Sequence, residues 1–357
     1  MDETIVEYID KEGKERQVEV DDETITTLDL SRHKIVTINL ETLTGLLSLQ
    51  ELDLGSNAIS EIDLSPLAKL PNLASLNLFK NNLEHIDLSQ LSDCKNLKDL
   101  NLGSNGISSL DLTPLAKVKG LTRLRLFNNQ LSSLDLSAFS KCITLEMLEV
   151  ENNQLKAIDL KPLAKCTNLL QLNLMYNSLT KLDLGPLATC TAMKFLYLHH
   201  NALTSIDLSA LENCLDLRIL RLGGNQLEQI NLAPLSQCKE LRRLGLAMNA
   251  IETIDLSPLK SAKKLTALDI AGNRISTVNL QPLSKCKELA ELYIHSDHPI
   301  ENDIKEIDIS PLFTCEELED IGIGKSTNIQ AKASLEDSAD IPLAIEELIE
   351  DDRITWV

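Results

Sequence analysis

The stretch Leu169–Ala192, LLQLNLMYNSLTKLDLGPLATCTA, decides the fold, because its pattern recurs every 24 residues along most of the chain. Each copy carries apolar residues at its first, fourth and sixth positions and an asparagine at its ninth. A fixed period of this size is typical of a solenoid, in which each repeat packs only against its neighbours. Further copies start at Ile25, Leu49, Leu73, Leu97, Leu121, Leu145, Met193, Leu217, Leu241, Leu265 and Leu289.

The pattern L-x-x-L-x-L-x-x-N-x-L resembles the leucine-rich repeat family, and the resemblance covers roughly residues 25–317. It implies an α/β solenoid shaped as a horseshoe. The apolar residues at positions 4 and 6 predict one short strand per repeat, so the strands should form a parallel inner sheet. Residues 1–24 alternate around Gly13 and predict a β-hairpin cap. About twelve repeats follow over 25–317, and residues 318–357 are expected to form a C-terminal cap.

The second half of each repeat predicts the outer wall. It commonly reads I-D-L-S-P-L, as at Ser65-Pro66 and Ser257-Pro258. Serine followed by proline is typical of an N-cap and a first helical position, which predicts a short helix or 3₁₀ turn. The aspartates at position 15 are expected to accept hydrogen bonds from backbone N–H groups at this turn. A column of carboxylates binding a divalent cation remains the alternative.

The asparagines at position 9 have an expected structural role, because an amide side chain can donate to and accept from backbone groups of neighbouring repeats. The last repeat is about five residues longer, and Asp297 is expected to replace the asparagine there. His295, Asp297 and His298 resemble a metal cluster by residue type, but a protruding loop is the favoured interpretation.

Composition narrows the function. The net charge of −20 disfavours nucleic acids and anionic membranes as partners. The eight cysteines share position 22, where other repeats hold Leu, Val or Ala, so we expect a column of buried thiols. Reduced thiols, together with the absence of a signal peptide or a long apolar segment, predict a cytoplasmic protein, which we expect to be monomeric.

No sequence motif of a catalytic site is present. The chain lacks a phosphate-binding glycine loop, a G-x-S-x-G turn and an H-E-x-x-H helix. We therefore expect no enzyme activity, no cofactor and no metal. The expected function is a scaffold that binds another protein, with an acidic and apolar segment, on the concave face of the sheet.

The variable positions 2, 3, 5, 7 and 8 face that surface and hold aromatic residues, methionines and arginines. The pattern indicates an apolar centre between two arginine groups, although the arginines could also balance neighbouring acids. A regulator of a GTPase, a phosphatase or a ubiquitin-ligase component is implied by the resemblance as an alternative. A phosphate-handling enzyme at the arginines is a further alternative. The predicted partner-binding residues are Arg123, Arg125, Phe127, Glu149, Met175, Tyr176, Phe195, Tyr197, His199, Arg218, Arg221, Arg242 and Arg243.

Overall fold

The computed structural model describes residues 4–20, 24–295 and 301–357. The chain divides into two compact units, Met1–Asn177 and Ser178–Val357, and each is described by itself. Within the described residues, no helix has the length and apolar character needed to cross a bilayer. Asp297 and His298 lie outside the described residues.

The first unit begins with a three-stranded antiparallel sheet of order β2-β1-β4, formed by β1 (Thr4–Asp10), β2 (Glu15–Val20) and β4 (Ile35–Ile38). Asp10 fixes the turn between the first two strands. Its Oδ1 accepts hydrogen bonds from the N–H groups of Glu12 and Lys14 at 2.9 and 3.0 Å, and Arg16 Nε donates to its Oδ2 at 2.7 Å. Hydrogen bonds to Arg16 and to the Lys14 N–H hold the pKa of Asp10 below its usual value.

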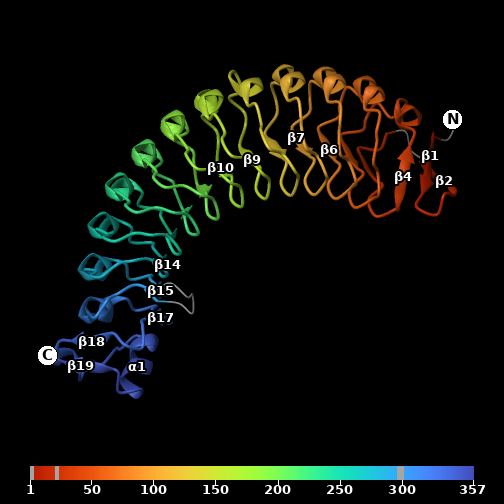
Figure 1. The fold of residues 1–357 in the computed structure, drawn as a ribbon. Coiled ribbons are helices and arrows are strands. Elements are labelled where there is room, and N and C mark those ends of the chain that lie inside the picture. The colour runs from red at the N-terminus through yellow and green to blue at the C-terminus, as the bar shows by residue number, and fades with distance from the viewer. Residues whose placement is uncertain (1–3, 21–23, 296–300) are drawn as a thin grey trace. The chain divides into compact units, whose positions relative to one another are not determined.

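The predicted parallel strands are present in both units, one for each repeat. Figure 1 shows that in residues 4–177 the coiled turns follow one side of the unit and the strands the other. The register advances by one repeat between neighbours, so that Leu100 pairs with Leu124 and Leu124 with Leu148. The first unit contains β3 (Thr27–Asp29), β5 (Glu51–Asp53), β6 (Ser75–Asn77), β7 (Asp99–Asn101), β8 (Arg123–Arg125), β9 (Met147–Glu149) and β10 (Gln171–Asn173).

The second unit continues the same arrangement, again with a buried leucine at the centre of most strands. Its parallel strands are β11 (Phe195–Tyr197), β12 (Ile219–Arg221), β13 (Arg243–Gly245), β14 (Ala267–Asp269), β15 (Glu291–Tyr293) and β17 (Asp320–Gly322). Within each repeat, the leucines at positions 1, 4 and 6 are almost fully buried. The core of each unit is therefore a set of aliphatic columns, as the repeat predicts.

The outer wall consists of short 3₁₀ helices. In the first unit they are η1 (Leu40–Leu43), η2 (Ser65–Lys69), η3 (Ser89–Asp93), η4 (Thr113–Lys117), η5 (Ser137–Phe139) and η6 (Lys161–Lys165). In the second unit they are η7 (Gly185–Thr189), η8 (Ser209–Asn213), η9 (Ala233–Gln237), η10 (Ser257–Ser261), η11 (Gln281–Lys285), η12 (Ser310–Thr314) and η13 (Ala333–Leu335).

The predicted capping residue of these turns was wrong. In η2 the N-cap is Leu64, and Ser65 is already the first helical residue. Asp63 performs the capping instead, because its Oδ1 accepts a hydrogen bond from the Ser65 N–H at 2.8 Å. This bond lowers the pKa of Asp63. Asn231 accepts the equivalent bond from the Ala233 N–H at 3.0 Å, which explains why asparagine replaces aspartate in this column.

The asparagines at position 9 connect neighbouring repeats, as predicted. Asn129 Nδ2 donates to the carbonyl oxygens of Leu102 and Leu126 at 3.0 Å, and its Oδ1 accepts from the Ile107 N–H at 3.0 Å. In the long repeat the expected substitution by Asp297 was wrong, because Asn302 makes these bonds. Its Nδ2 donates to the Ile270 carbonyl at 3.0 Å, and its Oδ1 accepts from the Ile275 N–H at 2.9 Å. The inserted residues therefore precede the structural asparagine rather than replace it.

The chain ends with a second small sheet, formed by β16 (Glu306–Asp308), β18 (Asn328–Ala331) and β19 (Ile354–Trp356). The only α-helix in the described residues, α1 (Leu343–Glu350), contacts β17 and buries Ala344 and Ile345. Trp356 packs against Phe313 of η12 with a ring-centroid distance of 6.2 Å. These contacts cover the last buried columns, which is the role expected of a C-terminal cap.

All eight cysteines are free and buried. Burial raises the pKa of the thiols of Cys94, Cys190 and Cys238 to about 11, which makes them poor nucleophiles. Cys142 differs, because hydrogen bonds from Cys166 and Thr144 stabilise its thiolate and lower its pKa to about 6 despite burial. This difference could not be predicted from the sequence, because all eight cysteines share one repeat position.

We therefore expect iodoacetamide to alkylate Cys142 first in the native protein, about tenfold faster than the other thiols. Peptide mass spectrometry after short exposures at pH 7 would measure the order of modification. Thr144→Val should slow the reaction at Cys142 while leaving Cys94 unchanged. Equal modification of all eight cysteines in the folded protein would contradict this expectation.

Candidate functional site

The exposed face of the sheet has a structural rule that the sequence analysis missed. An aspartate or asparagine at position 5 accepts a hydrogen bond from the N–H group two residues later. Asp53 Oδ1 accepts from the Gly55 N–H at 2.7 Å, and Asn101 Oδ1 accepts from the Gly103 N–H at 3.0 Å. Asn173 makes the same bond to the Met175 N–H at 3.2 Å, so its type is dictated by the fold rather than free to vary.

In some repeats the residue at position 5 is neither aspartate nor asparagine, so its side chain does not make this local hydrogen bond. In the first unit these residues are Arg125 and Glu149. In the second unit the departures at Tyr197, Arg221 and Gly245 are consecutive, before Asp269 restores the bond with the Ala271 N–H at 3.2 Å. Because a local backbone hydrogen bond has been given up there, these positions are the strongest candidates for contact with a ligand.

In the first unit the predicted charged residues neutralise one another. Arg125 Nη1 lies 2.7 Å from Asp99 Oδ1, and its Nε lies 3.4 Å from Glu149 Oε2. Arg123 Nη1 lies 3.4 Å from Asp99 Oδ2, and Gln171 Nε2 donates to Glu149 Oε1 at 2.8 Å. Desolvation raises the pKa of Glu149, while the Arg125 charge opposes this shift. These arginines therefore balance neighbouring acids, which the sequence analysis had left as the alternative.

The apolar residues of the first unit are also partly engaged. The Phe127 ring lies over Gly103, because a Cβ at that glycine would be 2.6 Å from the ring. Its centroid is 5.7 Å from that of Phe79. Met175 is half-buried, whereas Tyr176 remains 49% exposed. Among these predicted residues, Tyr176 presents the most accessible aromatic surface.

In the second unit the predicted residues Phe195, Tyr197, Arg221 and Arg243 lie in two parallel rows on the exposed sheet face, whereas His199, Arg218 and Arg242 lie outside the strands. The register places the residues of each row side by side at the spacing of neighbouring strands, about 4.8 Å. One row contains Phe195, Ile219, Arg243, Ala267 and Glu291, and the other contains Tyr197, Arg221, Gly245, Asp269 and Tyr293. We call Phe195, Tyr197, Arg221, Gly245 and Asp269 the sheet-face site.

An aromatic cluster bounds one end of the sheet-face site. The rings of Phe195 and Tyr197 are nearly parallel, with an interplanar angle of 5° and a centroid distance of 6.5 Å. His199 continues the cluster, with its ring centroid 6.2 Å from that of Tyr197. Burial, followed by the charges of His200 and Arg221, lowers the pKa of His199 to about 4. At neutral pH this imidazole is therefore uncharged and extends an apolar surface.

The four arginines do not converge on one point. Arg243 Nη2 lies 3.3 Å from Glu291 Oε1, which it can reach because the intervening residue in its row is Ala267. Arg218 and Arg242 lie near Glu240, whose pKa is lowered mainly by its hydrogen bond with Lys264 and also by both arginine charges. The four arginines therefore do not form the single anion site that a phosphate-handling enzyme would require.

Arg221 differs from Arg243, which lies on the adjacent strand. It is exposed, and no ion pair to it occurs among the described residues. The Gly245 side of this arginine is open, because a Cβ there would make only an ordinary contact with Arg221 Cγ at 3.7 Å. The fold therefore does not require glycine at position 245. Because Gly245 has no side chain, the space beside the Arg221 guanidinium is accessible. Asp269 lies beyond this space, and burial raises the pKa of its carboxyl group.

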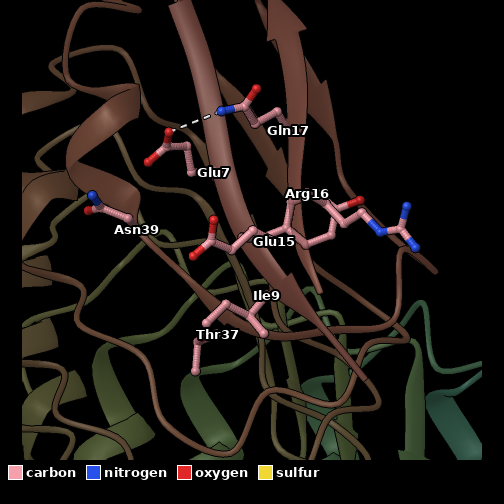
Figure 2. Close-up of a pocket in the computed structure, with 8 residues that line it drawn as sticks. Glu7, Ile9, Glu15, Arg16, Gln17, Thr37 and Asn39 are labelled. Carbon is pink, nitrogen blue, oxygen red and sulfur yellow. Dashed lines mark hydrogen bonds between the residues drawn. The ribbon is translucent and has the colours of Figure 1, made fainter. Parts of the chain in front are cut away.

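The described residues outside the sheet face form a hollow on the N-terminal sheet but no metal-binding cluster. Within residues 4–20, 24–295 and 301–357, no group of three His, Cys, Asp or Glu side chains is placed to hold a metal ion. A hollow of about 300 Å³ lies on the N-terminal sheet, lined by residues that include Glu7, Ile9 and Glu15 (Figure 2). Gln17 Nε2 donates to Glu7 Oε1 there at 3.2 Å. None of the predicted partner-binding residues lines this hollow.

Solved structures support the fold. An internalin from Listeria monocytogenes is 28% identical, covers 85% of this chain and 88% of its own, and has a TM-score of 0.63. The functional domain of a second Listeria monocytogenes protein, which includes a cysteine ladder, is 20% identical, with coverages of 88% and 70% and a TM-score of 0.65. A plant peptide hormone receptor in complex with its peptide is 20% identical, with coverages of 98% and 59% and a TM-score of 0.69.

Comparison of the sequence with protein families agrees with these structures. The family described as leucine rich repeat matches residues 23–83, 71–131 and 239–298. The family described as BspA type leucine rich repeat region matches residues 116–242. A search of curated proteins found no significant match. The matched segments together cover residues 23–298, and the chain belongs to the leucine-rich repeat proteins.

Proposed function

We propose that this protein is a non-catalytic scaffold that binds another protein through the sheet-face site of its second unit. The partner presents an extended segment with an apolar residue and an acidic residue. The observation that carries the proposal is the consecutive loss of the position-5 hydrogen bond at Tyr197, Arg221 and Gly245. These replacements give up a local structural bond and provide an aromatic surface, a cation and open space in adjacent strands.

The chemistry of each residue supports this partner. Phe195 and Tyr197 offer nearly parallel aromatic surface, and aromatic residues are common anchors of interfaces. Arg221 can form paired hydrogen bonds with a carboxylate, and its guanidinium is available to an acidic partner group because it forms no ion pair within the described residues. The plant receptor with a similar fold binds a peptide, which supports a peptide-like ligand for this chain as well.

The Tyr197→Ala/Arg221→Ala double variant tests this proposal. Peptides selected from a displayed library of random 12-residue sequences on the wild-type protein should share an acidic residue near an aromatic or aliphatic one. We expect the double variant to bind the selected synthetic peptides about 100-fold more weakly, since it loses both an anchor and a charge-assisted bond. Fluorescence polarisation measures the dissociation constants.

Phe79→Ala/Arg125→Ala serves as the matched control, because it also removes one aromatic and one arginine from the sheet face, but in the first unit. It should bind the selected peptides as the wild type does. Equal weakening in both double variants would point to a general loss of structure. Unchanged binding in the Tyr197→Ala/Arg221→Ala variant would refute the sheet-face site.

A further inference from the structure

A groove lies beside the sheet-face site, on the loops that follow β11, β12 and β13. Its volume is about 590 Å³, and its lining includes His200, Thr204, Gly224, Glu228, Met248 and Arg274. We call these six residues the rim groove. We propose that the rim groove holds an apolar side chain of the partner segment that the sheet-face site binds. This inference therefore rests on the proposed function and adds a second recognition point to it.

Two side chains of the groove, His200 and Met248, stand on backbone of left-handed conformation. Position 8 of the repeats adopts a left-handed conformation, with positive φ, where serine, asparagine or glycine occur in most repeats. Met248 has φ +57° and His200 has φ +54° in this row. A long apolar side chain is uncommon at such a φ, so Met248 departs from the serine, asparagine or glycine of most repeats. Met248 is nevertheless 38% exposed, so packing into the core does not explain its presence.

Gly224 separates these two side chains and forms the floor between them. A Cβ at this glycine would lie 2.5 Å from His200 Nδ1 and 3.0 Å from its Cε1, so the imidazole extends over the glycine. Its φ of +63° also favours glycine. His200 therefore covers Gly224 on one side of the groove and Met248 lines the other, and a larger residue at position 224 would displace the imidazole.

The surroundings define the kind of ligand. Met248 offers an exposed thioether side chain, which adapts its shape to apolar groups. Glu228 and Arg274 are exposed at the groove, and neither forms an ion pair within the described part of the chain. These features fit an extended peptide that places an apolar side chain between His200 and Met248, with a basic group toward Glu228 and an acidic group toward Arg274.

The groove is continuous with the sheet-face site. The His199 ring lies 6.2 Å from Tyr197 and 5.4 Å from His200, measured between ring centroids. One row of rings therefore leads from the sheet face to the wall of the groove. A single extended segment can contact both places, because four residues of extended chain span about 13 Å, close to three strand spacings.

Met248→Gly tests the proposal with the peptides selected on the wild-type protein. Glycine relieves the left-handed backbone and removes one wall, so we expect the melting temperature to stay the same or rise, while the peptides bind at least tenfold more weakly. Ser104→Gly is the control, because Ser104 occupies the same repeat position with φ +55° in the first unit. It should have the same direction of effect on melting temperature and no effect on peptide binding.

Three outcomes would overturn the inference. The first is a set of peptides that depend on Tyr197 and Arg221 but bind the Met248→Gly variant unchanged, which would leave the proposed function intact. The second is a library from which no Met248-dependent sequence can be recovered. A Met248→Leu variant, which keeps an apolar wall, should retain binding within about threefold, whereas equal loss in both variants would also contradict the groove.

Discussion

Replacing Asn81 by alanine is expected to lower the free energy of unfolding of the first unit by about 3 kcal/mol. Asn81 is 7% exposed and joins its own repeat to the preceding one. Its Oδ1 accepts from the Ile59 N–H at 3.0 Å, and its Nδ2 donates to the carbonyl oxygens of Leu54 and Leu78 at 3.0 and 3.1 Å. Alanine removes every one of these bonds and leaves a buried N–H group without an acceptor, which is the costly kind of loss.

The next residue, Asn82, provides a control of the same type. It is exposed, and Asn82→Ala should change the stability by no more than about 0.5 kcal/mol. Urea titrations followed by circular dichroism would measure both variants against the wild type. A similar small effect for the two substitutions would mean that the asparagine column is not what holds the turns in place.

The sequence predicted the repeating framework because one set of residues does the same job in every copy. Leucines at positions 1, 4 and 6 and asparagine at position 9 are repeated often enough to reveal burial and hydrogen bonding without a structure. The capping residue was misassigned for a physical reason. Aspartate and serine are both common at helix starts, and only the backbone shows that Asp63, two residues before Ser65, accepts the N–H bond.

The structural role of position 5 was not predicted from the sequence. Its alternation with buried leucines indicates that it faces outward, and we therefore treated it as unconstrained. Asn77 and Asn101 instead bond to local N–H groups, so polar residues there are structural and Tyr197 or Arg221 are the informative departures. The signal was present in the sequence as the prevalence of Asp and Asn at this position.

Side-chain pairing across strands was beyond sequence reasoning. Arg243 reaches Glu291 at 3.3 Å over two strand spacings, which depends on the short side chain of Ala267 between them. Arg125 similarly selects Asp99 and Glu149 from several nearby acids. The arginine groups therefore appeared equivalent in the sequence, whereas Arg123, Arg125 and Arg243 form ion pairs and Arg221 forms none within the described residues.

Glu151 should destabilise the first unit at neutral and alkaline pH. It occupies position 7 between the repeats of Phe127 and Met175, and its Oε2 is buried without a hydrogen-bond partner among the described residues. Burial, together with the charge of Glu149, raises the pKa of Glu151 from 4.5 to about 7. Because the native state holds this proton more tightly than the unfolded chain, the carboxyl group lowers stability as the pH rises from about 4.5 through 7.

Replacing Glu151 by methionine, the residue at this position in the next repeat, removes that cost. We expect the variant to be more stable than the wild type by on the order of 2–3 kcal/mol at pH 8, and by much less at pH 4.5. Glu149→Met is the control, since the Glu149 carboxylate is bonded to Arg125 and Gln171 and its loss should not stabilise the protein. Urea denaturation at both pH values measures the free energy of unfolding. An equal gain in stability at both pH values would indicate better packing alone. A loss of stability at pH 8 would show that the native structure accommodates the charged Glu151 carboxylate.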